Sequence, residues 1–368
     1  TWNDDLQAQL DENLDSLKSN ASSNALSTTA YLRRIFGNTM SEKIFEEQTK
    51  RTLLAQAYAQ NYEDSLTYTE DQLTEAYNAD PKSFDKVSYE VIRVNGAADT
   101  TDEDGNTIEV TDEMTQQAMA DAKASADSMY TAWMAGSDPS ELVDNDKSTY
   151  TSTDAGAWSD SVMMNWLFDD ARKAGDSTVL EDTDNSYYYV VLFHDRFRED
   201  YNTVDVRHIL IQPEATTLSE DDEGYDADVQ AKKDAAKQKA EDLLAQWKAG
   251  DATEDSFAEL ANENSADSGS NTNGGLYSQV HQGQMVDAFN DWCFDPARKA
   301  GDTGIVETDY GYHIMYFVGT DLPYWQVQVE DTLKNDDFNT WYTEKTADYT
   351  AEQSSFGVRF VRSTFSYS

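Results

Sequence analysis

The stretch FDDARKAGD at residues 168–176 returns as FDPARKAGD at residues 294–302, with eight of nine positions identical. Other segments recur around it in the same order: YTAWMAG, which ends at Gly136, is echoed by LAQWKAG, which ends at Gly250, and AGAW is echoed by GGLY. Identities in several separate blocks indicate that one structural unit occurs twice in the chain.

Each copy has the same predicted series of elements. A strand with alternating apolar residues (VSYEVIRV in the first copy, VRHILIQ in the second) precedes an acidic loop and a helix that ends in W-x-A-G. A small-residue turn, a short apolar helix, the KAGD turn and a closing strand follow. We therefore predict an α+β fold with two such modules.

The ends of the chain are predicted to be mainly helical. Residues 1–80 contain helical apolar spacing, and Thr69 with Gln72 three residues later forms a capping-box pattern before a helix that Asp80-Pro81 closes. Residues 322–368 contain the helical pattern VEDTLKNDDFNTWYTEKTADY and a final predicted strand, FGVRFVR.

The composition is strongly acidic, with 71 Asp and Glu against 27 Lys and Arg and a net charge of −44 over 368 residues. Such a chain is repelled by nucleic acid and by anionic lipid headgroups, so neither is an expected partner. The two acidic loops, at residues 100–111 and 219–230, lack the first and twelfth ligands of a calcium loop. We predict neither a metal site nor a cofactor.

Cys293 is the single cysteine, which excludes an intramolecular disulfide and a cysteine zinc site, and its apolar surroundings predict a buried thiol. No apolar run approaches the ~18 residues of a membrane span, and no signal peptide is visible. Because the chain starts at Thr1 without a methionine, we expect a mature or trimmed form.

Two of the four histidines lie on strands of the second copy. Strand alternation places His208 on one face with Val206 and Leu210, and places His313 with Met315 and Phe317. A single strand histidine is more often structural than functional. A sequence alignment of the copies sets His208 opposite Tyr89 and His313 opposite Tyr187 or Tyr188, so both histidines are absent from the first copy, which favours a function.

A loop of the second copy, FAELANENSADSGSNTNGG at residues 257–275, has an S-x-D-x-x-S pattern that the first copy lacks. Asp267 in this pattern is either a loop cap or a functional carboxylate, and its spacing leaves both open. Met285 and Phe289 follow at helical spacing, which is more often typical of a core than of a pocket.

These segments, together with HILI, GQMVDAF and TDYGYHIM, resemble the parvulin family of peptidyl-prolyl isomerases in family order across residues 204–319. The whole layout resembles extracytoplasmic foldases of the PrsA and SurA type, in which one parvulin module is often degenerate. The resemblance implies small antiparallel sheets wrapped by helices. It also implies four parts: a helical chaperone-like segment (1–85), a degenerate module (86–200), an active module (203–320) and a C-terminal helix and strand (321–368) that pack with the N-terminal part.

The resemblance also implies site residues. His208, His313 and Asp267 match the catalytic positions, and the matches to the proline pocket and its surroundings are Met285, Phe289, Tyr277 and Thr308. One departure is that Leu276, Tyr277 and Ser278 follow the glycine pair, where the family has an acidic residue, Leu and Gly.

The implied function is non-covalent isomerisation of X–Pro bonds in unfolded or partly folded exported polypeptides, combined with chaperone action. A holdase without meaningful isomerase activity is the alternative, and nothing specific favours a structural or adhesion protein. The family resemblance implies an extracytoplasmic location, membrane-anchored, periplasmic or secreted, and leaves open whether the chain forms a homodimer.

Overall fold

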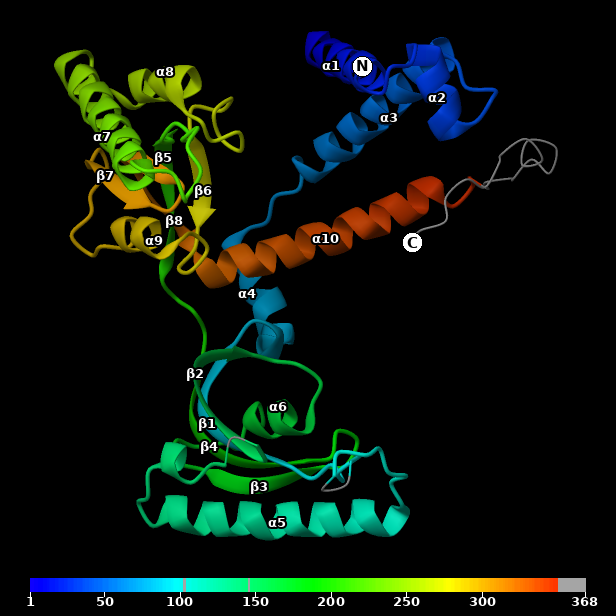
Figure 1. Ribbon diagram of the computed structural model, residues 1–368, viewed down its shortest axis with the longest axis vertical. Coiled ribbons are helices and arrows are strands. Elements are labelled where there is room, and N and C mark those ends of the chain that lie inside the picture. Colours follow the sequence, from blue (N-terminus) through cyan, green and yellow to red (C-terminus); the bar gives the residue numbers. More distant parts are fainter. Residues whose placement is uncertain (102–103, 145, 350–368) are drawn as a thin grey trace. The chain divides into compact units, whose positions relative to one another are not determined.

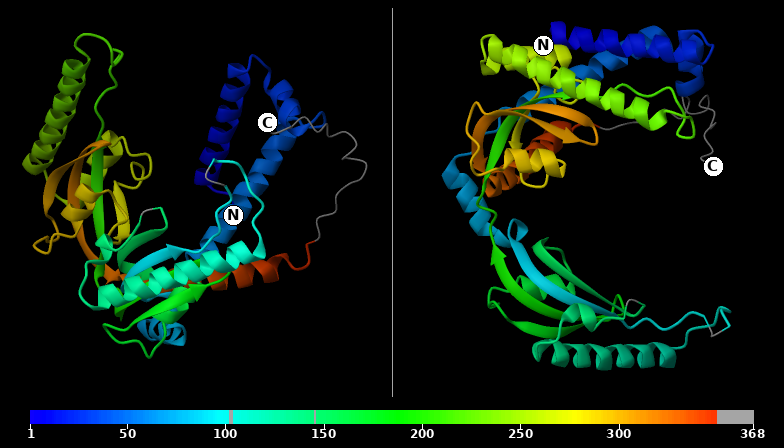
Figure 2. Two further views of the ribbon diagram at one scale, coloured as in Figure 1. Left: turned by 60° about the horizontal axis from the view of Figure 1, so that its bottom comes forward. Right: turned by 60° about the vertical axis from the view of Figure 1, so that its left-hand side comes forward.

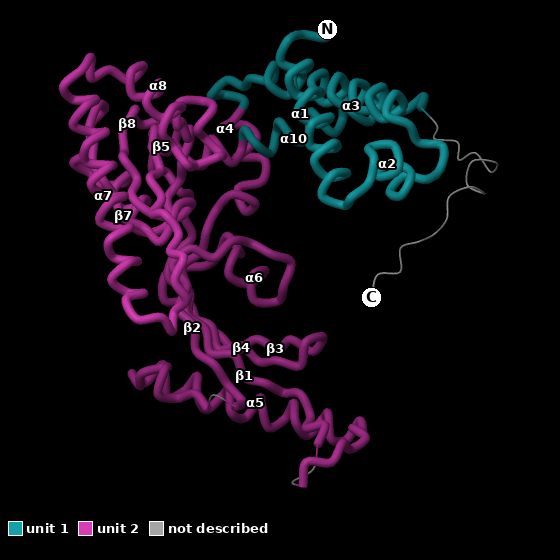
Figure 3. The backbone as a smooth tube through the Cα atoms, turned by 45° about the horizontal axis from the view of Figure 1, so that its top comes forward, with its two compact units in different colours: residues 1–72, 330–368 teal, residues 73–329 magenta. Residues whose placement is uncertain are grey.

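The computed structural model describes residues 1–101, 104–144 and 146–349 (Figure 1). The chain divides into two compact units, one formed by residues 1–72 with 330–368 and the other by residues 73–329 (Figure 3). The predicted strand FGVRFVR lies outside the described residues. None of the described helices combines the length and the apolar character needed to cross a membrane. The bounds of the four predicted parts stay predictions.

The first unit is built from helices, as the sequence predicts. It contains α1 (Asp4–Ser23), α2 (Thr28–Phe36), α3 (Glu42–Glu63) and most of α10 (Tyr324–Thr346). Within this unit, the ring of Trp341 on α10 stacks on Tyr62 of α3 at 4.4 Å between centroids, and Tyr68 donates a hydrogen bond of 2.9 Å to Asp337. The end of the chain's last described helix is therefore held by the N-terminal helices.

The connection to the second unit begins with the predicted capping box. The amide of Gln72 donates to the Thr69 hydroxyl at 3.3 Å, and the Thr69 amide donates to the Gln72 side chain at 2.9 Å. These bonds start α4 (Glu70–Ala79), and a 3₁₀ turn, η1 (Pro81–Ser83), follows where the sequence predicts the helix to end.

The first module is a four-stranded antiparallel sheet in the order β2-β1-β4-β3. Helix α5 covers one face and α6 the other (Figures 1 and 2). Its elements are β1 (Lys86–Asn95), α5 (Asp112–Met134), η2 (Pro139–Glu141), β2 (Ser148–Ala157), α6 (Val162–Leu167), β3 (Ser177–Asp182) and β4 (Tyr187–Phe197).

The second module repeats this plan in the order β6-β5-β8-β7, with α7 and α8 on one face and α9 on the other. Its elements are β5 (Asn202–Ile211), α7 (Tyr225–Ala249), α8 (Glu254–Asn264), β6 (Leu276–Val280), α9 (Asp287–Cys293), β7 (Thr303–Thr308) and β8 (Gly311–Pro323). The predicted α+β class with two small antiparallel sheets is confirmed.

The repeated KAGD turn performs the same task in both sheets. The Gly175 amide donates to the Phe193 carbonyl at 2.9 Å, and the Gly301 amide donates to the Phe317 carbonyl at 2.8 Å. Both glycines have left-handed backbones, with φ of 88° and 87°, which a side chain would disfavour. The duplicated sequence therefore preserves a turn that leads into the edge strand of each module and is hydrogen-bonded to the last strand.

These turns also fix which residues of the two modules correspond, and they correct the alignment made from sequence. Phe193 corresponds to Phe317, so by strand pairing Val91 corresponds to His208 and Tyr189 to His313. The alignment to Tyr89 and to Tyr187 or Tyr188 was wrong. Both β1 and β5 carry a bulge directly before the position of Tyr89, so the bulge leaves the correspondence unchanged. The sequence alignment matched VSYEVI with VRHILI, which shifts the two strands by two residues.

Candidate active site

A cavity of ≈ 270 Å³ in the second module collects six of the seven predicted site residues. His208 comes from β5, His313 from β8, Tyr277 from β6 and Phe289 from α9, while Asp267 lies in the loop after α8. The described residues lining the cavity are His208, Leu210, Asp267, Tyr277, Gln284, Met285, Val286, Phe289, Tyr310 and His313. Elements separated by about 100 residues in the chain therefore meet at one pocket.

The two histidines are buried and bonded to each other. Their Nδ1 atoms are 3.0 Å apart and their rings stack at 5.2 Å between centroids. Strands β5 and β8 are direct neighbours, and the register pairs His208 with Met315 and Leu210 with His313, so the histidines lie on adjacent strands two residues out of step. Phe289 presents its ring edge-on to both at 5.4 and 5.5 Å.

Each histidine has a second partner on its outer side. His208 Nε2 lies 2.8 Å from Oδ2 of Asp267, and the Thr308 hydroxyl lies 2.8 Å from Nε2 of His313. Thr308, which the family resemblance places near the histidine pair, does not line the cavity, but its hydroxyl extends the row of hydrogen bonds to a fourth residue.

Asp267 is the most heavily bonded group of the site. Its Oδ2 atom accepts hydrogen bonds from Ser270 at 2.5 Å and Tyr277 at 3.0 Å besides His208, and the Gly269 amide donates to Oδ1 at 3.1 Å. Burial acts to raise the pKa of Asp267, but the hydrogen bonds from Ser270, His208, Gly269 and Tyr277 outweigh it and lower this pKa to about 2. The carboxylate is therefore held ionised.

Both histidines are held neutral. Burial lowers the pKa of His313 to about 4, helped by the neighbouring His208, while Asp267 opposes the shift. Burial also lowers the pKa of His208, with its hydrogen bond to Asp267 acting in the opposite direction. In the interior the cost of removing a charged imidazolium from water exceeds the attraction of one carboxylate.

These protonation states give the hydrogen bonds one direction. An ionised carboxylate only accepts, so His208 donates from Nε2 to Asp267 and accepts at Nδ1 from the N–H of His313. His313 then accepts at Nε2 from the Thr308 hydroxyl. The tautomers follow from this network, which leads from a hydroxyl through two imidazoles to a buried anion.

A glycine pair holds the Asp267 loop against β5. Gly274 and Gly275 have φ of +74° and +71°, and a Cβ on Gly275 would lie 2.2 Å from the carbonyl oxygen of His208. The His208 amide in turn donates to the Gly275 carbonyl at 2.8 Å. Only glycine allows this approach, so the pair fixes the distance between the loop and the histidine strand.

Comparison with known proteins identifies the module. Residues 188–319 match the family model described as the PPIC-type PPIASE domain, beginning in β4 and ending in β8. The second module is a PPIC-type peptidyl-prolyl isomerase domain. The PPIase domain supplies every residue of the pocket and of the hydrogen-bonded row.

Curated relatives carry the name foldase. "Foldase protein PrsA 1" of Listeria innocua is 30% identical over 115 residues, which cover 31% of this chain and 30% of the relative. "Foldase protein PrsA" of Caldanaerobacter subterraneus is 30% identical over 157 residues, 42% of each chain. The chain thus matches less than half the length of these relatives.

Solved structures match this chain at lower sequence identity and with low TM-scores. PrsA from Bacillus subtilis matches 42% of this chain and 54% of its own, at 23% identity and a TM-score of 0.28. A structure titled as SurA-like chaperones of Campylobacter jejuni covers 94% of this chain and 84% of its own, at 14% identity and a TM-score of 0.24. TM-scores this low do not establish a shared overall arrangement.

Five residues of the PPIase domain site were not predicted as site residues: Ser270 and the lining residues Leu210, Gln284, Val286 and Tyr310. Ser270 is the last residue of the S-x-D-x-x-S pattern, so its bond to Asp267 could have been predicted from that spacing. Gln284, directly before Met285, and the exposed Tyr310 line the cavity. Neither carries a pattern that separates it from an ordinary polar loop residue.

Cys293 is 1% exposed, and burial raises the pKa of its thiol to about 12. It is the last residue of α9, belongs to the core cluster and does not line the cavity, and its burial is what the sequence predicts. A thiol that stays protonated is a poor nucleophile, so the site residues themselves point to non-covalent chemistry.

The first module keeps the fold but replaces the site. Val91 and Tyr189 stand where the PPIase domain has its histidines, and Asp182 stands at the position of Thr308. The Tyr189 hydroxyl is 3.5 Å from Asp182, which is 4% exposed and accepts hydrogen bonds from Asn185. The first module thus has a hydrogen bond at this place, between Tyr189 and Asp182, but no pair of imidazoles.

Proposed function

We propose that the chain catalyses cis-trans isomerisation of X–Pro bonds in unfolded polypeptides, and that the PPIase domain alone performs the reaction. The observation that carries this proposal is the row of hydrogen bonds from Thr308 through His313 and His208 to an ionised Asp267, set beside an apolar pocket. The family match of residues 188–319 supports it.

The pocket suits a proline ring. Met285 and Phe289 belong to the apolar cluster under the cavity, Phe289 is 3% exposed, and Tyr277 forms part of the wall. A cavity of ≈ 270 Å³ holds one ring and its neighbouring peptide group but not a folded segment. Binding here removes water from the amide, which strengthens every electrostatic interaction with it.

The reaction is a rotation that breaks no bond. Resonance in a planar amide gives a barrier of roughly 18–20 kcal/mol and places partial negative charge on the carbonyl oxygen. That charge decreases when the amide twists. The ionised Asp267 therefore destabilises the planar amide more than the twisted one, and each ~1.4 kcal/mol of such difference accelerates rotation about tenfold.

In this mechanism the histidines position the anion and transfer no proton. His208 fixes Oδ2 of Asp267 through a 2.8 Å hydrogen bond, and His313 fixes the tautomer of His208. We call them positioning residues for this reason. Their neutrality matters, because a positive imidazolium beside Asp267 would cancel the field that acts on the substrate.

We further propose that the substrates are exported polypeptides bound before folding, and that the protein works outside the cytoplasm, where it is anchored to a membrane, periplasmic or secreted. The foldase names of the relatives support this assignment. The site is complete within one chain, so the reaction does not require a homodimer. Sedimentation velocity of the full chain would show whether two copies associate.

Refolding of a protein limited by a cis proline tests the proposal, with wild type, His208→Ala and Asp267→Ala compared at equal concentration. The expected result is acceleration by wild type and a loss of at least tenfold in both variants. His281→Ala, which removes a histidine outside the cavity, is the matched control and should leave the rate unchanged. Suppression of aggregation, measured alongside, reports chaperone action separately. Equal rates in all variants with preserved suppression would support the holdase alternative instead.

A further inference from the structure

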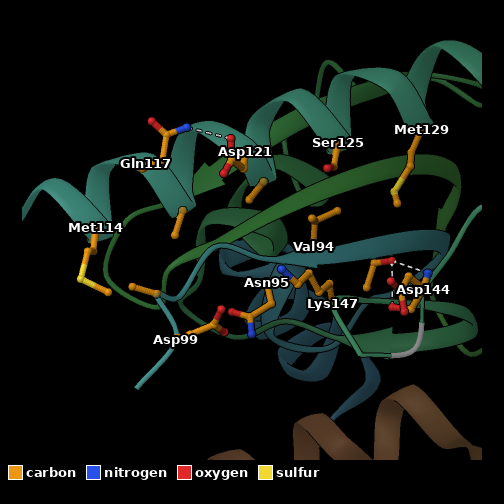
Figure 4. A pocket seen from close by; sticks show the side chains of 14 residues that line it. Val94, Asn95, Asp99, Met114, Gln117, Asp121, Ser125, Met129, Asp144 and Lys147 are labelled. Atoms are coloured by element: carbon orange, nitrogen blue, oxygen red, sulfur yellow. Dashed lines mark hydrogen bonds between the residues drawn. The ribbon is translucent and has the colours of Figure 1, made fainter. Parts of the chain in front are cut away.

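The first module has a cavity of its own, unrelated in position to the pocket of the PPIase domain. It measures ≈ 430 Å³ and lies between α5 and the residues that follow β1 and precede β2. Figure 4 shows Asp121, Ser125 and Met129 of α5 facing Val94 of β1 and Lys147 across it. We call this cavity the α5 groove.

In the second module, a lysine side chain occupies the corresponding place. Helices α5 and α7 correspond without a gap, since Trp133 and Trp247 are both 8% exposed and Ala126 and Ala240 are both 0% exposed. Counting back from these pairs places Lys232 of α7 at the position of Ala118, which lines the α5 groove.

Lys232 bridges its helix to the loop after β5. Its Nζ atom donates to the Ala215 carbonyl at 2.5 Å and lies 3.5 Å from the Asp228 carboxylate, and its side chain is only 22% exposed. The strand register that pairs Val91 with His208, continued along the chain, places Ala98 at the position of Ala215. Ala98 also lines the α5 groove.

The α5 groove is therefore the place of a lysine side chain that the first module does not supply from its helix. Ala118 ends at its Cβ, while the opposite wall, with Ala98, is retained. The walls also suit a lysine. Val94, Met114 and Met129 offer apolar and thioether surface to a four-carbon stem, and methionine adapts to varied partners.

The charges around the α5 groove favour a cation. Asp99, Asp121 and Asp144 line it, and Lys147 is the one base among its described lining residues. Asp99, Asp121 and Asp144 are exposed, so they attract an approaching ammonium group from solvent and add to the field of a chain with net charge −44.

We propose that the α5 groove binds lysine side chains of unfolded client polypeptides, with the ammonium group near the loop of Ala98 and the stem along α5. This rests on the proposed function in so far as it concerns clients. It gives the module without the histidine pair a use of its own: holding a cationic segment while the PPIase domain acts on a proline elsewhere in the same chain.

Fluorescence anisotropy of a labelled, proline-free peptide with one lysine between leucines tests this on the full chain. A peptide with norleucine in place of lysine keeps the stem and removes the charge. Ala118→Lys would fill the α5 groove with the side chain that the second module has there. Gln116→Lys adds the same charge two residues away, about 200° around the helix, and is the matched control.

We expect the lysine peptide to bind wild type and Gln116→Lys within twofold of each other, and Ala118→Lys at least tenfold more weakly. Asp121→Asn should weaken binding several-fold without filling space. Equal binding of the norleucine peptide, or equal losses in both lysine variants, would overturn the proposal.

An isomerase assay on a short proline-containing peptide, run with the same variants, separates this proposal from the proposed function. Ala118→Lys should retain wild-type isomerase rates on a short peptide substrate. A wild type without isomerase activity that still binds the lysine peptide would refute the enzyme and leave the α5 groove assignment standing.

Discussion

His208 and His313 lie on neighbouring antiparallel strands with their Nδ1 atoms 3.0 Å apart, although 105 residues separate them in the chain. The pairing requires one of the two ring nitrogens to carry no proton, because two N–H groups cannot bond to each other. Burial satisfies this requirement by keeping both rings neutral, against the attraction of the ionised Asp267. The protonation state of the pair is thus a consequence of the fold.

Acid should therefore weaken catalysis well below neutral pH. The pKa of His313 is about 4 and that of Asp267 about 2, so this imidazole stays neutral and the carboxylate ionised from neutral pH down to roughly pH 5, and burial also lowers the pKa of His208. We expect kcat/KM to stay level across that range and to fall as the pH approaches 4. A decline centred near 6.5, the ordinary histidine value, would contradict this assignment.

The same burial should make stability depend on pH. The pKa of His313 is lower in the folded state than the ordinary 6.5, so the unfolded chain binds more protons between about pH 6.5 and 4. Stability from this group is present above pH 6.5 and is lost as the pH falls through that window. Urea unfolding of wild type and His313→Gln at several pH values should show a steeper decline in wild type, on the order of 1–3 kcal/mol over the window. Parallel curves would contradict it.

Tyr277→Phe should raise the pKa of Asp267. The Tyr277 hydroxyl donates one of three hydrogen bonds to Oδ2, and Gly269 leaves room for it, since a Cβ there would lie 2.9 Å from the hydroxyl oxygen. Carbon NMR of the carboxyl group should show titration above the wild-type value of about 2. We expect an isomerase loss of a few-fold with the substrate KM nearly unchanged, because the ring remains in the wall. An unchanged Asp267 titration would show that this hydrogen bond has no effect.

Gly275→Ala should disrupt the site through the backbone. The new methyl group would collide with the His208 carbonyl, at a residue that already has a left-handed backbone. We expect a loss of stability of more than ~2 kcal/mol, with isomerase activity strongly reduced. Gly283→Ala is the matched control, with φ of +77° and no atom within 4 Å, and should cost only about 1 kcal/mol. Equal melting temperatures of the two variants would refute a role for the close approach.

Much of this architecture could be predicted from the sequence because the two modules share identical residues in corresponding segments. The KAGD turn, the W-x-A-G helix ends and the histidine strands all occupy their expected elements. Edge strands β2 and β3 were not predicted, since β2 is largely exposed and has no regular apolar alternation. The correspondence of Val91 with His208 was missed because the apolar runs VSYEVI and VRHILI also match two residues out of register, a shift that keeps the alternation of strand faces.

In the candidate site, too, the residues that could be predicted are those that belong to a sequence pattern. Residues that stand in compact motifs, such as Asp267 and Met285, were identified, and the structure brings them to one cavity. The α5 groove was not predicted because it depends on what Ala118 lacks relative to Lys232. A missing side chain acquires meaning only when a structure shows which space it leaves.

The central claim is that the histidine pair gives the second module an activity that the first module does not have. The most direct test replaces His208 by Val and His313 by Tyr in the full chain, which are the residues that the first module carries at the corresponding positions. Proline-limited refolding is then measured beside melting temperature and aggregation suppression. We predict that catalysis of refolding falls at least tenfold while suppression of aggregation persists. A folded double variant that catalyses refolding as fast as wild type would contradict the account.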